Sequence, residues 1–397
     1  MRTLVLCLAG AADRPVEDLG GRTPLEAAAT PHLDRVAAEG RLGRVVAAPA
    51  GMRPEEVAFV LALYGLDPSS YGDIGATLDA AGLGVEVGSL DQALRLSLVT
   101  ADERTILDPT AGHVSRDEAE LLLSSLGEAL ADDALSLHAG AAGSHLLVWA
   151  GARDVRLSTV PPYEVVERAL DSALPRGTGI GRLLAAMQRS AALLPGHEVN
   201  ELRRDLGENP ATLIWPWSPG VSLPLPSMKE RTGLSALAVG VDNAFRGAAV
   251  LQGIPVEVPA GSTGRMDSML RAKTDAALAG LEAHDLVFLH VAALEAASHA
   301  RDFVGKVELL ERIDGYVIGP LLEAATRRGD LRLVVLAGPT ASTESGRVLD
   351  DPVPFALFGP GVRSHRRSAF TEVGAQQSGF RVDRAHELLD FVLHLGR

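Results

Sequence analysis

Short apolar runs alternate along this chain with segments in which apolar residues recur at helical spacing. Seven runs are expected to be buried strands: residues 3–8, 145–150, 212–215, 236–241, 286–291, 332–338 and 354–359. Parallel strands are buried on both faces and are joined by crossover helices, so they read as continuous apolar runs separated by helical patterns. The alternation therefore predicts an α/β fold with a mostly parallel sheet.

Several helices are expected to start at recognisable caps. The segment 23–26 (TPLE) combines a capping Thr, a Pro in the first turn and a Glu three residues on. Ser115 and Glu118 form the same kind of capping box. The Thr-Pro pair at 30–31 is expected to open a further helix, which Gly40 ends.

The pattern changes between about residues 85 and 185. Strands there become shorter and carry polar residues such as Arg95 and Ser97, and the loops are rich in Gly and Ala. This predicts an inserted second domain at 85–185, with a discontinuous core formed by 1–84 and 186–397.

Composition narrows the class of protein. The 397 residues suggest two or three domains, and 47% hydrophobic with 22% charged residues is typical of a soluble globular protein. The formal charge of -14, from 37 basic and 51 acidic residues, argues against a general binder of nucleic acid or of anionic membranes. A local basic pocket for a phosphorylated small molecule remains compatible with this charge.

The single cysteine, Cys7, excludes a disulfide framework and a cysteine-based zinc site. It lies in the first apolar run, where inert core packing is expected. The first twelve residues superficially resemble a signal peptide, but the apolar part is short and ordinary structured sequence follows. No run approaches the ~20 apolar residues of a membrane span, and the protein is expected to be cytoplasmic.

One loop attracts attention as a candidate metal site. His290 ends a predicted strand, and Glu295 and His299 follow it four residues apart. In a helical turn that spacing places both side chains on one face, where they are able to share a metal. A catalytic metal usually has three protein ligands, so the alternative is a solvated Glu-His pair.

Three other motifs give weaker evidence of function. The segment 177–182 (GTGIGR) lacks a preceding strand and the full glycine spacing of a dinucleotide site, so a helix-entry turn is expected. The segment 220–224 (GVSLP) lacks the last Gly of a nucleophile elbow. The adjacent pair Glu55-Glu56 precedes an apolar helix, where carboxylates favour the helix dipole without any function.

Six stretches together resemble the archaeal-type cofactor-independent phosphoglycerate mutases of the alkaline phosphatase superfamily. They are residues 4–40, 65–87, 197–220, 225–264, 284–303 and 350–363. The resemblance spans nearly the whole chain in unbroken order. It implies an alkaline-phosphatase-like, doubly wound, mostly parallel sheet core with an inserted smaller α+β lid domain.

In that family two divalent ions, usually manganese, activate a serine that transfers the phosphate. The resemblance implies that this chain departs from the pattern at most of those positions. Ala9 stands where the family has a metal-binding Asp, and Glu56 falls on the nucleophile. Gly338-Pro339 replaces an Asp-His ligand pair, and Val348 stands at an expected His. Glu295 replaces an Asp, and only His299 is retained, so these two form a vestigial metal site.

The positions that would bind the substrate also differ from the family pattern. Arg95 matches an arginine of the family's lid domain, and Arg271 replaces a lysine that would face the phosphate. Pro109, Thr110 and His113 stand at positions where a family segment carries basic phosphate contacts. Arg95 and Arg271 either bind an anion or are each paired with a neighbouring carboxylate.

The first hypothesis is a degenerate relative of phosphoglycerate mutase that does not catalyse phosphoryl transfer. It would act as a non-catalytic protein partner or bind a phosphorylated or carboxylated metabolite, with no cofactor. The alternative is a metal-dependent mutase or phosphatase with an altered manganese centre built from Glu295, His299 and Glu56. A structural role in a homo-oligomer is the third hypothesis. Glu56 would imitate a phosphorylated serine only weakly, because a carboxylate carries less charge.

Overall fold

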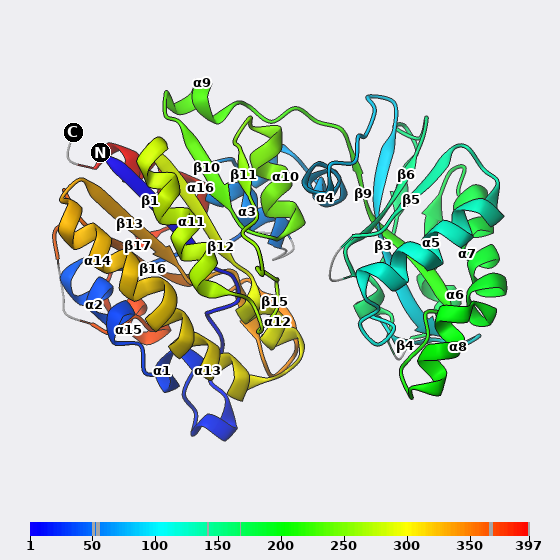
Figure 1. The fold of residues 1–397 in the computed structure, drawn as a ribbon, viewed down its shortest axis with the longest axis horizontal. Coiled ribbons are helices and arrows are strands. Elements are labelled where there is room, and N and C mark those ends of the chain that lie inside the picture. The colour runs from blue at the N-terminus through cyan, green and yellow to red at the C-terminus, as the bar shows by residue number, and fades with distance from the viewer. Residues whose placement is uncertain (50–51, 53–55, 141–142, 167, 365–367, 396–397) are drawn as a thin grey trace. The chain divides into compact units, whose positions relative to one another are not determined.

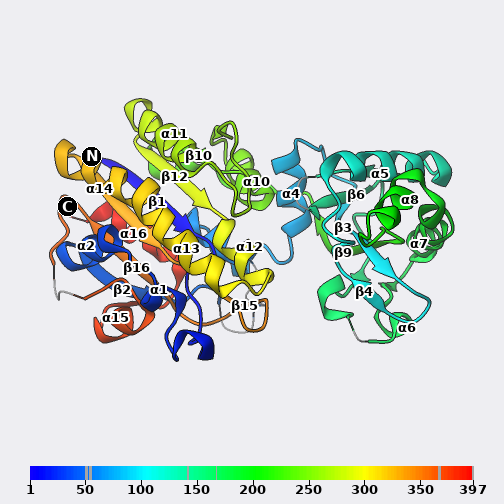
Figure 2. The same cartoon turned by 60° about the horizontal axis from the view of Figure 1, so that its bottom comes forward.

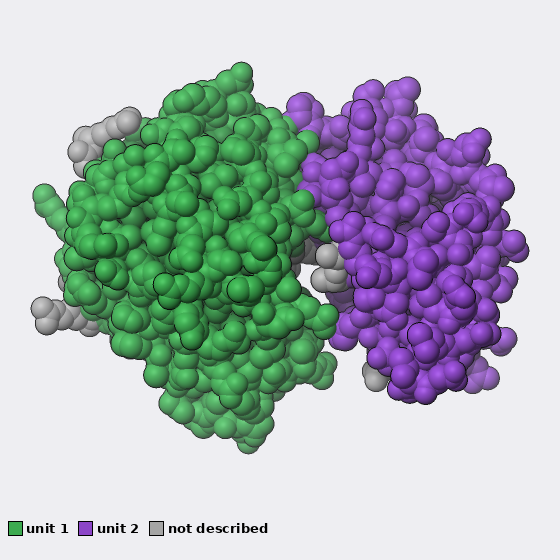
Figure 3. Space-filling model, viewed as in Figure 1, with its two compact units in different colours: residues 1–72, 225–397 green, residues 73–224 purple. Residues whose placement is uncertain are grey.

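The chain folds into two compact units in a computed structural model that describes residues 1–49, 52, 56–140, 143–166, 168–364 and 368–395. The first unit comprises residues 1–72 and 225–397, and the second comprises residues 73–224 (Figure 3). None of the helices within the described ranges is long and apolar enough to cross a bilayer.

An eight-stranded sheet forms the centre of the first unit (Figure 1). In spatial order its strands are β11 (Val256–Glu257), β10 (Ala236–Val239), β12 (Leu286–Val291), β1 (Arg2–Leu8), β13 (Leu331–Leu336), β16 (Val353–Phe358), β2 (Arg41–Val45) and β17 (Arg381–Val382). The first five strands run parallel, whereas β16 is antiparallel to both β13 and β2. A small hairpin adds β14 (Thr340–Ser342) and β15 (Arg347–Leu349).

Helices cover both faces of this sheet (Figures 1 and 2). They are α1 (Pro24–Ala27), α2 (Pro31–Glu39), α3 (Glu56–Leu63), α9 (Met228–Thr232), α10 (Asn243–Leu251), α11 (Leu270–Ala283), α12 (Ala293–His299), α13 (Phe303–Ile313), α14 (Gly319–Arg328), α15 (Glu372–Gln377) and α16 (Ala385–His394). Helices α11 and α14 pack on β12 and β13, while α3 and α16 pack on each other and line an apolar layer against β1 and β13. The α/β fold with a mostly parallel sheet is therefore confirmed.

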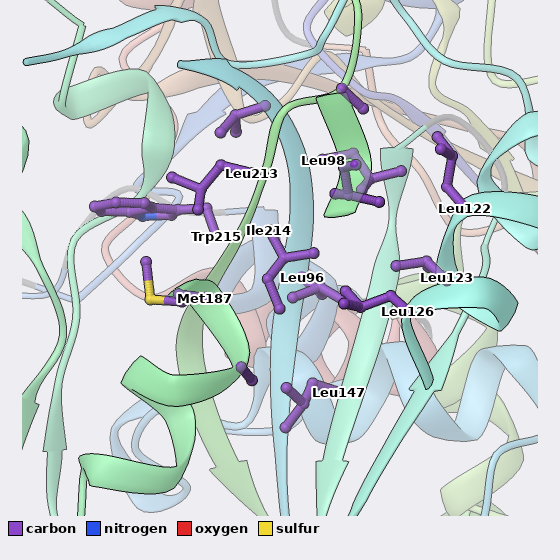
Figure 4. Packing of buried hydrophobic residues seen from close by; sticks show 14 of the residues in the cluster. Leu96, Leu98, Leu122, Leu123, Leu126, Leu147, Met187, Leu213, Ile214 and Trp215 are labelled. Atoms are coloured by element: carbon purple, nitrogen blue, oxygen red, sulfur yellow. The ribbon is translucent and has the colours of Figure 1, made fainter. Parts of the chain in front are cut away.

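The second unit is built around an antiparallel sheet. Its strands are β3 (Gln92–Ala101), β4 (Ile106–Asp108), β5 (Leu135–His138), β6 (His145–Trp149), β9 (Leu213–Val221) and the separate pair β7 (Leu157–Ser158) and β8 (Arg176–Gly177). Its helices are α4 (Gly75–Leu83), α5 (Arg116–Leu130), α6 (Leu170–Ala173), α7 (Gly181–Leu193) and α8 (Glu198–Asp205). Figure 4 shows its core, in which Trp215, Met187 and leucines of β3, α5 and β6 are buried together.

This second unit is wider than the 85–185 expected from the sequence. Strand β9 pairs with β3 from Leu213 to Val221, and α4 packs against both strands. The structure therefore places the boundaries at Asp73 and Pro224. Sheet pairing decides this, because an apolar run does not reveal which sheet it will join.

The expected local features are confirmed. All seven apolar runs contain strands, and the capping boxes at Thr23 and Ser115 are both formed. The helix at Pro31 ends at Gly40, and Gly181 starts α7 directly after the turn at 178–180. The two-residue strand β8 precedes this turn, which the sequence did not lead us to expect. Cys7 is buried, and its thiol donates to the carbonyl of Gly338.

A buried histidine makes the second unit sensitive to acid. His145 on β6 is almost fully buried, its Nδ1 accepts from the Gly140 amide at 3.2 Å, and burial lowers its pKa from 6.5 to about 4. The unfolded chain takes up a proton at His145 near pH 6.5, whereas the folded chain does so only near pH 4. We therefore expect stability to fall as the pH is lowered across this window, by about 1.4 kcal/mol per pH unit from this group.

Urea unfolding of the second unit at several pH values measures this slope. His145→Gln should remove most of it, and His394→Gln, at an exposed position of the first unit, should leave it unchanged. An equal slope in wild type and His145→Gln would contradict the assignment.

Candidate functional site

Three neighbouring strands of the first unit end at one edge of the sheet. In the order β12, β1, β13 they run parallel, and ligands of α/β proteins bind beyond the carboxyl ends of such strands. The ends are tied together by backbone hydrogen bonds: the Ala9 amide donates to the Val291 carbonyl at 3.0 Å, and the Gly10 amide to the Pro339 carbonyl at 3.2 Å. This edge is the candidate site.

The two candidate metal ligands lie together at this edge. Glu295 and His299 are on α12, and Glu295 Oε1 is 3.4 Å from His299 Nε2. The Glu295 side chain is largely buried and the His299 ring is half exposed, while its Nδ1 lies 2.8 Å from the Gly346 carbonyl. Burial opposes protonation of the ring, but the Glu295 carboxylate and the Gly346 carbonyl outweigh it and raise the pKa of His299.

The residues that directly follow β1 and β13 cannot act as side-chain ligands. Ala9 follows β1 and Pro339 follows β13, and Ala12 is fully buried beside them. Across the described residues, no three His, Cys, Asp or Glu side chains converge where they would hold a metal ion. The two donors present do not fit a two-metal centre, which needs several carboxylate and imidazole ligands.

Two other positions were predicted from the resemblance, Val348 and Glu56. Val348 is on β15, opposite Ala341 of β14. Glu56 starts α3, but its side chain lies outside the described residues, as does Glu55. Its interpretation as an occupant of the nucleophile position therefore stays a prediction.

A buried ion pair next to this edge was not predicted from the sequence. Lys306 Nζ donates to Asp13 Oδ2 at 2.8 Å and to the Ala341 carbonyl at 2.9 Å, and both charged side chains are buried. Asp13 also accepts from the amide and the hydroxyl of Thr343. Burial lowers the pKa of Lys306, and Asp13 offsets this only in part. The pair joins α13 to the loop after β1 and to the β14 hairpin.

A second charged cluster lies where β10 and β12 end, and the sequence reasoning missed it too. Lys273 on α11 is fully buried, and its ammonium donates to the His290 carbonyl at 3.3 Å. Burial lowers the pKa of Lys273 to about 8, while nearby Asp242 acts in the opposite direction. Arg246 on α10 also has its pKa lowered by burial and raised by Asp242, and its Nε has no hydrogen-bond partner among the described residues.

His290 belongs to the same cluster rather than to the metal pair. Its ring stacks on Phe245 with centroids 4.8 Å apart, and burial lowers its pKa to about 3, so it is neutral at physiological pH. Its Nδ1 has no partner within the described part of the chain. Lys273 and Arg246 bring two positive charges to one nearby carboxylate, Asp242, and this surplus of positive charge makes this end of the sheet a candidate anion site.

Arg271 lies two residues from Lys273 but on a different side of α11. Its side chain is 76% exposed, and its Nε is 3.9 Å from Asp275 one turn along. Residues two apart on a helix do not share a face, so Lys273 reaches His290 whereas Arg271 is exposed. Anion binding by Arg271 stays a prediction.

Arg95 is held inside the second unit. Its Nε donates to Asp79 Oδ2 at 2.6 Å and its Nη2 to Oδ1 at 3.4 Å, and its guanidinium lies 5.3 Å from the centre of the Trp217 ring. In the structure, therefore, Arg95 is paired with a neighbouring carboxylate, that of Asp79. Anion binding by Arg95 stays a prediction.

The segment with Pro109, Thr110 and His113 forms a tight loop in the second unit. Asp108 accepts from the Thr110 amide and hydroxyl at 2.8 and 2.7 Å, and Gly112 and His113 have positive φ values of 66° and 56°. The loop therefore presents Thr110 and His113 to solvent in a conformation that costs local strain.

Known proteins match this chain over nearly its whole length. A family model described as 2,3-bisphosphoglycerate-independent phosphoglycerate mutase matches residues 37–200. A probable enzyme of that description from Geobacter sulfurreducens is 32% identical over 99% of this chain and all of its own length. A second, mutase 2 of Methanothermobacter thermautotrophicus, is 33% identical over 99% of this chain and 97% of its own length.

Solved structures share the fold. A protein from Pyrococcus horikoshii superposes with a TM-score of 0.80 at 24% identity, covering 99% of this chain and 97% of that one. The cofactor-independent phosphoglycerate mutase of Thermoplasma acidophilum superposes with a TM-score of 0.60 at 22% identity, with full coverage of both chains.

Proposed function

The chain belongs to the family of 2,3-bisphosphoglycerate-independent phosphoglycerate mutases, and from that premise we propose that it binds a phosphorylated or carboxylated metabolite without catalysing phosphoryl transfer. The observation that carries the proposal is the contrast between two neighbouring parts of one sheet edge. Lys273 and Arg246 supply desolvated positive charge where β10 and β12 end. Ala9, Ala12 and Pro339 line the edge where β1 and β13 end.

Binding and catalysis place different demands on this edge. An anion needs donors and positive charge, and hydrogen bonds to charged groups contribute about 1.5–3 kcal/mol each. Phosphoryl transfer needs in addition an activated nucleophile and ions that neutralise the transferred group. Glu295 and His299 alone would have to bind the ions needed for phosphoryl transfer. One ring nitrogen of His299 already forms a hydrogen bond with the Gly346 carbonyl.

Calorimetric titration with 3-phosphoglycerate tests the binding proposal. We expect Lys273→Met to weaken binding about 10- to 100-fold, because it removes one of the two positive charges of the cluster. Affinity of the wild type should also fall as the pH is raised above about 8, because the Lys273 ammonium then loses its proton. Arg271→Met, on the exposed side of the same helix, is the matched control and should bind as wild type does.

A mutase assay on the same samples, with and without manganese, tests the catalytic half. No turnover is expected under either condition. Turnover that requires manganese and is lost in His299→Ala would support the alternative, an altered metal centre. Equal affinities for wild type and Lys273→Met would overturn the assignment of the anion site.

A further inference from the structure

Two helices of the second unit, α5 and α8, are joined along a seam (Figure 2). Arg203 of α8 donates to Glu118 of α5 at 2.9 Å, and the ring of His197 at the start of α8 is 3.0 Å from the Ser125 hydroxyl of α5. The pairs 118–203 and 125–197 run in opposite directions along the chain, so the helices are antiparallel. We call the outer surface along their contact the α5–α8 seam.

The seam has a rigid base. Arg203 is buried and also donates to the carbonyls of Ala111, Gly112 and Asn209 at 2.9, 3.0 and 3.0 Å. A guanidinium with this many fixed partners holds both helices and the loop beside them in one arrangement. A surface organised in advance loses less entropy when it binds.

Exposed leucines border the seam on both helices. Leu121 lies between Glu118 and Ser125 at helical spacing, so it is on the flank of α5 that turns towards α8, and it is 53% exposed. On α8, Leu202 is 60% exposed, and Leu206, directly after the helix and one turn on, is 67% exposed. Because α8 runs antiparallel to α5 with Val199 and Arg203 inside, its handedness turns these two leucines towards α5.

Carboxylates surround these leucines. Glu198, Glu201 and Asp205 lie on the exposed side of α8, and none of them forms an ion pair with another described residue. Asp117 adds a further exposed carboxylate at the start of α5. Arg204, the other exposed charge of α8, donates to the Pro195 carbonyl instead. The surface thus combines an apolar centre with a negative rim.

We propose that the α5–α8 seam is a docking surface for a basic amphipathic helix of another protein. Leucines of such a helix would fill the seam, and its lysines or arginines would meet the carboxylate rim, as in other helix-in-groove complexes. A second copy of this chain fits poorly, because each copy carries a formal charge of -14 and the same negative rim. The inference is independent of the anion site in the first unit, and either stands if the other fails.

Fluorescence anisotropy of the full chain with a labelled probe tests the proposal at 150 mM salt. The probe is a helical peptide of leucines and lysines at amphipathic spacing, and its counterpart has glutamate in place of lysine. We expect the basic peptide to bind and the acidic one not to bind. Leu202→Ser/Leu206→Ser should weaken binding at least about tenfold, which corresponds to 1.4 kcal/mol.

Leu90→Ser is the matched control, because Leu90 is 69% exposed in the same unit but lies away from the seam. Leu90 precedes the start of β3, whereas Asp108, which contacts the loop after α8, pairs with the other end of β3. It should bind as wild type does. Hydrogen exchange should show peptide-dependent protection within residues 116–130 and 198–208. Absence of binding, equal binding by the double variant, or protection elsewhere would overturn the proposal. So would sedimentation showing a dimer that Leu202→Ser/Leu206→Ser abolishes, since the occupant would then be a second copy.

Discussion

Lys306→Met should cost the first unit about 3–5 kcal/mol of unfolding free energy, one of the two largest effects expected in this protein. The substitution removes the ammonium that lies 2.8 Å from Asp13 and leaves that carboxylate buried without a counter-charge. The hydrogen bonds from Thr343 remain but do not neutralise it. Urea unfolding followed by a probe in the first unit measures the loss.

Arg35→Met is the control for this experiment. Arg35 and Glu39 are 2.8 Å apart but about half exposed, and such surface pairs contribute ~0–1 kcal/mol. The double variant Lys306→Met/Asp13→Asn should recover part of the loss, because it removes the unpaired charge. A cost for Lys306→Met no greater than that for Arg35→Met would show that the pair is not buried in solution.

Gly10→Ala is the second substitution expected to have a large effect, about 2–5 kcal/mol. Gly10 has φ +76°, which L side chains rarely adopt, and an added Cβ would lie 2.5 Å from Glu295 Cα and 2.6 Å from its amide nitrogen. The obstacle is backbone, so the loop after β1 or the start of α12 would have to move. Thermal or urea unfolding of the first unit reports the loss.

Gly21→Ala separates the cost of the positive φ from the cost of the steric clash with Glu295. Gly21 has almost the same φ, +75°, but nothing lies within 4 Å of the position of its Cβ. It should therefore cost only the backbone strain, about 1–2 kcal/mol. The difference between the two variants measures the close approach of Gly10 to Glu295. Equal losses would mean that this contact is absent in solution.

Both substitutions concern the way the chain builds the edge of its sheet. The Lys306 pair and the Gly10 contact bring α13 and α12 against the loop after β1, and this loop is where the family resemblance expects a metal-binding Asp in place of Ala9. The scaffold of the edge is thus closely packed. On the proposed function, the anion is bound next to it, at the ends of β10 and β12.

Much of the fold was readable from the sequence because it depends on local patterns. A strand buried on both faces must be apolar throughout, so 286–291 could be identified before its partners were known. The capping boxes at Thr23 and Ser115 depend on residues three apart. The spacing of Glu295 and His299 likewise predicted their shared face on α12.

Features that join distant segments were decided by the tertiary structure. The run at 212–215 was predicted as a strand, but only pairing with β3 assigns it to the second unit and moves the boundaries to Asp73 and Pro224. Lys306 and Asp13 are 293 residues apart, and no sequence pattern links them. Likewise, Lys273 rather than Arg271 reaches His290 because of the way α11 is rotated on the sheet.

By itself, then, the sequence determined which segments become strands and helices, where several helices begin, and which family the chain resembles. Those properties follow from the period of apolar residues and from contacts a few residues long. The tertiary structure alone decided which charges are buried together, how far each unit extends and which leucines stay exposed at the α5–α8 seam. The physical reason is that burial and pairing depend on which surfaces meet when the chain packs, and residues far apart in sequence carry no local record of that meeting.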